Sequence, residues 1–118
     1  GKMTTHTGQC HCGAVAYEVA VDIENVMECN CSICRRTGWR LSFVGASQFT
    51  LTRGENDLVD YQFGKKHLHH PFCKHCGVRS FSWGPNEQGD KMFAVNTRCL
   101  DDFDVGQVEV NQYDGAAI

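Results

Sequence analysis

The sequence has few of the features that would place the chain in a membrane, in the secretory pathway or on nucleic acid. Its 11 Lys and Arg are outnumbered by 14 Asp and Glu, and only two of its 118 residues are proline. Without an excess of positive charge there is no electrostatic case for a nucleic-acid or membrane partner. No apolar run approaches the length of about 20 residues that spans a bilayer. Residues 1–6 have no apolar signal-peptide core.

What the chain does have is eight cysteines and an apolar fraction of 42%. That composition and length predict one domain over residues 1–118 with its own core. Residues 1–3 are expected to be a disordered start or a remnant of expression. Cysteine clusters without a secretory signal indicate a reducing compartment, so we expect a cytoplasmic protein whose thiols bind metal rather than form disulfides.

Short alternating runs predict a mainly β fold of antiparallel strands with little helix. The clearest run alternates Val15, Tyr17, Val19 and Val21 with smaller or polar residues. Similar short runs, separated by Gly-rich turns, predict further strands at 26–29, 41–46, 49–52, 59–63, 79–83, 92–96 and 108–110. The tail from Gln112 is expected to be loose.

Residues 32–37 are the best candidate for a helical turn. Asn30 or Ser32 is expected to cap its start, and Gly38 to end it with a positive φ. So short a helix is not stable alone, so we expect a bound metal to hold it.

Seven of the eight cysteines fall into one set of four and one set of three. The four-thiol set joins a Cys-x-Cys pair to a Cys-x-x-Cys pair about sixty residues later, and its members are Cys10, Cys12, Cys73 and Cys76. Four thiolates form a closed tetrahedral shell that suits zinc and leaves no open position. The sequence therefore predicts a structural zinc site that clips the start of the chain to its middle.

The three-thiol set consists of Cys29, Cys31 and Cys34. Three protein ligands leave the fourth tetrahedral position open, which is typical of catalytic zinc. A second interpretation is a second structural site completed by His69, His70 or Cys99, and a third is a vestigial, partly filled site. Of these candidates, Cys99 is expected to be a small buried apolar side chain.

The cysteine motifs resemble those of the glutathione-dependent formaldehyde-activating enzyme family, which includes centromere protein V. The resemblance covers nearly the whole chain and rests on GQCHCGAV at 8–15, CNCSICRRTG at 29–38, GENDL at 54–58 with Tyr61, HPFCKHCG at 70–77 and NTRCLD at 96–101. It implies a β-tent fold with two zinc ions per chain. The four-thiol set matches the family's structural zinc ligands, and the three-thiol set its catalytic ligands.

The resemblance also implies a carbon–sulfur lyase type of activity, the joining of glutathione and formaldehyde into S-hydroxymethylglutathione. The substrates would then be a small thiol and a small aldehyde, and we expect neither a membrane nor a nucleic-acid partner. Arg35, Arg36 and Arg98 are candidates for pairing with substrate carboxylates. His69 or His70 is a candidate proton shuttle, since an ordinary histidine pKa is about 6.5.

Two other functions compete with catalysis. Thiols add to formaldehyde readily without help, so a non-catalytic carrier or sensor of thiol adducts is the first alternative. The second is a zinc-stabilised interaction module associated with chromatin. The acidic charge balance and the lack of a basic tail count against that module.

Overall fold

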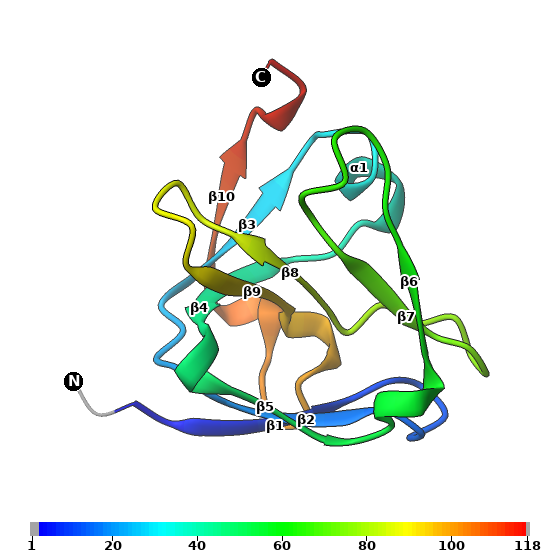
Figure 1. The fold of residues 1–118 in the computed structure, drawn as a ribbon. Helices are drawn as coiled ribbons and strands as arrows, with labels where there is room; N and C mark the ends of the chain where they lie inside the picture. Colours follow the sequence, from blue (N-terminus) through cyan, green and yellow to red (C-terminus); the bar gives the residue numbers. More distant parts are fainter. Residues whose placement is uncertain (1–2, 118) are drawn as a thin grey trace.

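The computed structural model describes residues 3–117, and its elements are ten short strands, one helical turn and five 3₁₀ turns (Figure 1). The expectation of a disordered or non-native start falls on residues 1 and 2, outside the described range, and on Met3, which is exposed. The mainly β fold predicted from the alternating runs is confirmed.

The strands form three sheets. The first is an antiparallel sheet in the order β1-β2-β5, with strands β1 (Thr5–Gln9), β2 (Ala16–Ala20) and β5 (Phe49–Arg53). The second is five-stranded in the order β10-β3-β4-β9-β8, with β10 (Glu109–Tyr113), β3 (Asn25–Cys29), β4 (Leu41–Gly45), β9 (Lys91–Asn96) and β8 (Phe81–Pro85). The third is the hairpin of β6 (Leu58–Tyr61) and β7 (His70–Cys73).

The main core lies between the three-stranded and five-stranded sheets. Its aromatic centre stacks Phe49 against Phe93 at 4.2 Å between ring centroids and against Tyr17 at 5.2 Å. Tyr17 and Val19 are almost fully buried from one sheet, and Val95 from the other. Tyr17 and Val19 belong to the alternating run recognised in the sequence. Their burial fixes the register of β2, because a shift by one residue would turn them to the other face.

One strand pairing departs from the expected antiparallel pattern. The last strand, β10, pairs in parallel with β3, and Tyr113 lies opposite Cys29. The tail predicted to be loose from Gln112 is therefore wrong as far as residue 117, because Gln112 and Tyr113 belong to β10 and Gly115–Ala117 forms a 3₁₀ turn. Parallel pairing across more than eighty residues leaves no local signal in the sequence, so residue patterns do not indicate that this segment is ordered.

The helical turn exists but starts differently from expectation. Helix α1 (Cys34–Thr37) ends at Gly38, whose φ of 69° and N–H bond to the Cys34 carbonyl (2.9 Å) match the predicted C-cap. The predicted caps at Asn30 and Ser32 are wrong: the N-cap position is Ile33, and no side chain caps it. The Asn30 side chain is engaged with the C-terminal segment instead.

Candidate functional site

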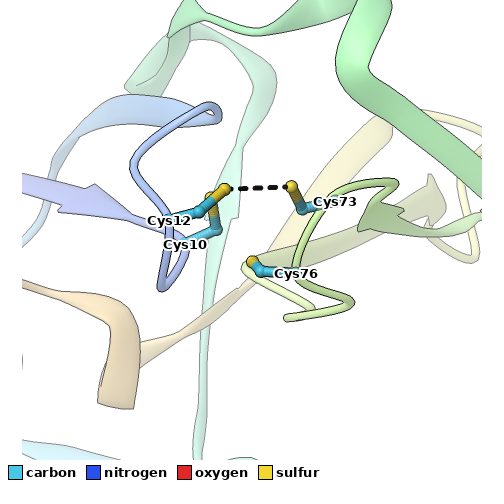
Figure 2. Close-up of side chains that lie close together, drawn as sticks. All are labelled: Cys10, Cys12, Cys73 and Cys76. Atoms are coloured by element: carbon cyan, nitrogen blue, oxygen red, sulfur yellow. Dashed lines mark hydrogen bonds between the residues drawn. The ribbon is translucent and has the colours of Figure 1, made fainter.

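Four cysteine sulfurs from two distant turns face one another beside the β1–β2 connection (Figure 2). Cys10 and Cys12 follow β1, whereas Cys73 ends β7 and Cys76 lies in the turn after it. All four Sγ atoms lie within 4.8 Å of one another. Cys12 Sγ is 3.7 Å from that of Cys10 and 3.6 Å from that of Cys73. A tetrahedral zinc with bonds of about 2.3 Å would hold its sulfurs about 3.8 Å apart, so this spacing fits the ion.

The two turns present backbone N–H groups to these sulfurs. Gly13 (φ 82°) and Gly77 (φ 77°) follow the second cysteine of each pair in the left-handed region, which glycine adopts readily. In the first turn the Val15 N–H donates to Cys10 Sγ at 3.3 Å. In the second, an N–H two residues after Cys73 donates to its sulfur at 3.4 Å. Such donors favour the thiolate form that a metal requires.

The electrostatics of this four-thiol set call for a cation. The Val78 N–H lowers the pKa of Cys76 to about 6. The Ala14 N–H also lowers the pKa of Cys12, but burial and the neighbouring thiols outweigh it and raise that pKa to about 11. The Cys76 thiol therefore loses its proton easily, whereas the Cys12 thiol keeps its proton, because two thiolates at this distance repel each other. A bound dication removes that conflict and allows all four to ionise.

The three-thiol set is assembled where β3 of the five-stranded sheet leads into α1, away from the β1–β2 connection (Figure 1). Cys29 ends β3, Cys31 lies in the following turn and Cys34 opens α1. Their Sγ atoms lie within 4.8 Å of one another, and the Cys31 N–H donates to Cys29 Sγ at 3.4 Å. The donor set and its spacing fit a zinc ion held by three thiolates.

Residues suggested as a fourth ligand do not join this group. Within residues 3–117, neither His69, His70 nor Cys99 contributes an atom to the three-thiol set. His69 Nδ1 pairs with Asp60, and Cys99 packs against the main core, where burial raises its pKa. Cys99 is therefore a mostly buried side chain beside the core, as expected.

A buried indole supports the three-thiol set from the inside. Trp39 is 3% exposed and packs against Cys34 together with Leu41 and Ala94. Its Nε1 is buried and makes no hydrogen bond among the described residues. Burial raises the pKa of Cys34 to about 12, and the indole N–H opposes that rise. An unpaired donor beside this half-buried thiol fits a site whose sulfur becomes anionic on binding metal.

Comparison with known proteins gives the family. The family of glutathione-dependent formaldehyde-activating enzymes matches residues 5–114. The chain belongs to this family. A crystal structure of a Rhodobacter sphaeroides protein is similar to it, with a TM-score of 0.76 and 31% sequence identity over 89% of this chain and 99% of that one.

The two histidines suggested as proton shuttles have different surroundings in this member of the formaldehyde-activating family. His69 is held by Asp60 and stacks on Trp83, with ring centroids 3.7 Å apart. His70 is 4% exposed and packs between Trp39 and Phe63, at 6.4 and 5.2 Å. Of the two, only His70 contacts the indole that supports the three-thiol set.

The His70 ring has a defined tautomer and stays neutral. Its Nδ1 lies 3.0 Å from the Tyr61 carbonyl oxygen, which only accepts, so Nδ1 carries the proton and Nε2 has a free lone pair. Burial lowers the pKa of His70, and the nearby Arg79 charge adds to that effect. A neutral histidine with a bare Nε2 can accept a proton.

A cavity of about 490 Å³ opens beside the loop that carries the three-thiol set. We call it the arginine cavity, and its lining residues are Ser32, Ile33, Arg36, Thr37, Tyr61, Phe63 and Arg79. Of the three arginines expected from the sequence to meet substrate, Arg36 lines it, whereas Arg35 and Arg98 do not. Arg79 was missed, because it lies in an irregular stretch far from the thiol loop in sequence and only folding of the β6–β7 hairpin brings it there.

The C-terminal segment also reaches the three-thiol set. A Cβ placed on Gly115 would lie 2.5 Å from Cys29 Sγ, so the backbone there touches the sulfur. Asn30 fixes this approach by donating to Asp114 Oδ1 (2.9 Å) and accepting from the Ala116 N–H (2.9 Å). No motif in the sequence indicated this contact.

Among residues 3–117 the chain has no helix long and apolar enough to cross a membrane.

Proposed function

We propose that this chain holds two zinc ions and that only the second takes part in chemistry. The four-thiol set would be a closed structural site, with Cys10, Cys12, Cys73 and Cys76 as ligands. The three-thiol set of Cys29, Cys31 and Cys34 would be the open site. The observation that carries the proposal is the convergence of three sulfurs with no fourth ligand atom from residues 3–117.

The activity that fits this site is the addition of a small thiol to a small aldehyde, as in the formation of S-hydroxymethylglutathione. In that step the thiol loses its proton, the sulfur forms a bond to the aldehyde carbon, and the carbonyl π pair moves to oxygen, which takes up a proton. Zinc, when bound, keeps a coordinated thiol deprotonated near neutral pH. The family description and the thiol chemistry of the site support this assignment, and the reverse reaction makes the protein a carbon–sulfur lyase.

The chain's own residues would orient the substrate and hold its proton. The backbone N–H of Cys31 would support the sulfur of Cys29, and the unpaired indole N–H of Trp39 lies beside Cys34. The bare Nε2 of His70 would accept the thiol proton and return it to the aldehyde oxygen, which keeps the proton balance within the site. His69 would serve mainly to position the β6–β7 hairpin, because its ring is already committed to Asp60 and Trp83.

Exchange spectroscopy tests the enzyme proposal. With the zinc-loaded protein added, the rate of interconversion of formaldehyde plus glutathione with S-hydroxymethylglutathione should rise above the uncatalysed rate. Cys31→Ser, matched for folded content, should return the rate to the background. Unchanged exchange at saturating thiol, together with measurable thiol binding, would instead indicate the non-catalytic carrier.

A further inference from the structure

We propose that a second cavity binds a flat aromatic molecule carrying one carboxylate, and that Lys91 is the partner of that carboxylate. Its volume of about 510 Å³ falls in the range of about 300–1,000 Å³ typical of small-molecule sites. The lining contains no cysteine, so this inference is independent of the function proposed above. We call it the aromatic cavity, and the lining residues that matter here are Phe49, Phe81, Trp83, Lys91 and Phe93.

The aromatic cavity opens where the three sheets meet (Figure 1). Phe49 comes from the three-stranded sheet, Phe93 from the five-stranded sheet and Leu58 from the β6–β7 hairpin. The floor is the aromatic centre of the main core, because Phe49 lies 4.2 Å from Phe93 and 4.8 Å from Phe81 between ring centroids. These packed rings offer a flat apolar surface, and a ligand ring that covers it removes that surface from water.

The Trp83 indole forms a wall that is fixed before any ligand arrives. Its ring stacks on that of His69 at 3.7 Å between centroids, and the two planes differ by only 7°. The backbones of the same two residues exchange hydrogen bonds of 2.8 and 3.0 Å. The cavity therefore needs little ordering when it is filled, which reduces the cost of binding.

Lys91 places a single positive charge over this aromatic surface. Its Nζ lies 4.3 Å from the ring centroid of Trp83 and 5.1 Å from that of Phe93. Among residues 3–117 it forms no ion pair. The faces of the rings attract the ammonium but carry no net charge to neutralise it. A carboxylate would neutralise it, and a charged hydrogen bond is stronger beside apolar surface than in water.

The two carboxylates of the lining leave this role to the ligand. Asp60 is already engaged, because Oδ2 pairs with His69 Nδ1 and Oδ1 accepts the His70 N–H at 3.0 Å. Glu55 is exposed in the 3₁₀ turn after β5, where water screens its charge, and it does not pair with Lys91. The charge over the rings is therefore positive, which favours an aromatic anion over an aromatic cation.

The test is a titration of the zinc-loaded protein followed by ¹H–¹⁵N NMR, because the two tryptophans report on different sites. Trp83 lines the aromatic cavity, whereas Trp39 packs against Cys34. The probes are indole-3-acetate and its neutral counterpart indole-3-acetamide. We expect indole-3-acetate to shift the Trp83 indole signal and not that of Trp39, with a Kd of about 1 mM or lower for a ligand of this size. The acetamide should bind about tenfold more weakly, the effect of losing one charged hydrogen bond.

Three variants assign the two parts of the recognition. Lys91→Gln should abolish the preference, so that acid and amide bind equally weakly. Lys65→Gln is the matched control, because it removes the same charge from the exposed turn after β6, outside the cavity, and should keep the tenfold preference. Ala46→Leu places a larger apolar side chain at the exposed rim and should weaken both probes alike. Circular dichroism and zinc content show whether each variant is folded.

The outcomes separate the aromatic cavity from the three-thiol set. A Trp83 signal that moves with neither probe would overturn the inference. Equal binding of acid and amide by the wild type would also overturn it, because the cavity would then select no charge. Movement of the Trp39 signal alone, lost in Cys31→Ser, would place the acid at the three-thiol set instead. Formaldehyde exchange enters none of these measurements, so the inference can fail while the enzyme proposal stands, and the reverse.

Discussion

Cys31 and Cys73 are chemically the same residue in sites of different proposed roles, so their substitutions should separate structure from function. Cys73→Ser opens the shell that joins the two turns, and zinc at such a site contributes about 10 kcal/mol or more to folding. Because small domains are stable by only about 5–15 kcal/mol, we expect little soluble folded protein.

Cys31→Ser is the matched substitution in the three-thiol set. It should keep the far-ultraviolet circular dichroism spectrum of the wild type and lose about one zinc ion per chain, as counted by metal analysis. The three-thiol set ties together only the turn after β3 and α1, so less of the fold depends on it. Unfolding of Cys31→Ser to the same extent as Cys73→Ser would contradict the division of roles.

The buried ring of His70 should make stability depend on pH in a defined direction. Its pKa is lowered in the folded protein, mainly by burial, whereas the unfolded chain titrates near 6.5. As pH falls through about 6.5, the unfolded state takes up a proton that the folded state does not, so the free energy of unfolding decreases until the lowered pKa is reached. For His70→Gln, the free energy of unfolding should decrease less steeply between about pH 7.5 and 5.5, as measured by urea denaturation in saturating zinc. Protonation of the cysteine ligands of zinc affects the wild type and His70→Gln alike. Equal slopes of unfolding free energy against pH in the two proteins would therefore contradict a neutral His70.

The members of both thiol sets could be predicted from the sequence, but their surroundings could not. Spacing alone grouped Cys10 with Cys73 and set Cys29 apart, because chelation constrains local geometry. Arg79 carried no such signal: its place at the arginine cavity depends on the aromatic rings of Phe72 and Tyr61, which a hairpin brings beside it. Packing across strands is a tertiary property that residue spacing does not encode.

At the scale of elements, the segment after β10 acts as a strap across the three-thiol loop. Parallel pairing of β10 with β3 brings Tyr113 opposite Cys29, and the chain then turns over the sulfur at Gly115. Asn30 was expected to cap α1, and instead its side chain bonds to both sides of that turn. A cap is inferred from neighbours in sequence, whereas the actual partners lie 84 and 86 residues away.

Gly115→Ala should weaken metal binding at the three-thiol set alone. The added Cβ would lie 2.5 Å from Cys29 Sγ and 3.2 Å from Cys31 Cβ, so either the strap or the ligands must shift. Displaced supporting groups typically reduce metal affinity about 10–100-fold. We expect a competition titration with a chromophoric chelator to show this loss for one zinc ion only. Gly45→Ala is a suitable control, because Gly45 has an ordinary negative φ of −75° and its Cβ would meet only Gln48 Oε1, at 3.5 Å, and it should leave both affinities unchanged.

Over the whole molecule, the two thiol sets lie at different ends of the fold and join different pairs of elements (Figure 1). The four-thiol set ties the β1–β2 connection to the end of β7, and so links the three-stranded sheet to the β6–β7 hairpin. The general fold class followed from alternating patterns, but the order β10-β3-β4-β9-β8 did not. Strand order depends on which long-range pairings bury the most apolar surface, and short strands of similar composition do not distinguish these.

This arrangement predicts that chelation removes the metals in two stages. An open site exchanges through its vacant position, so the three-thiol set should lose zinc first, at low chelator concentration, with circular dichroism and near-ultraviolet spectra almost unchanged. The closed site should release its zinc only at higher concentration, and we expect residues 1–118 to unfold then as one unit, because metal binding there is folding free energy. Cys31→Ser should show the second stage alone. A single stage in which both ions leave as the fold is lost would mean that the three-thiol set is also structural, and the enzyme proposal would lose its open coordination position.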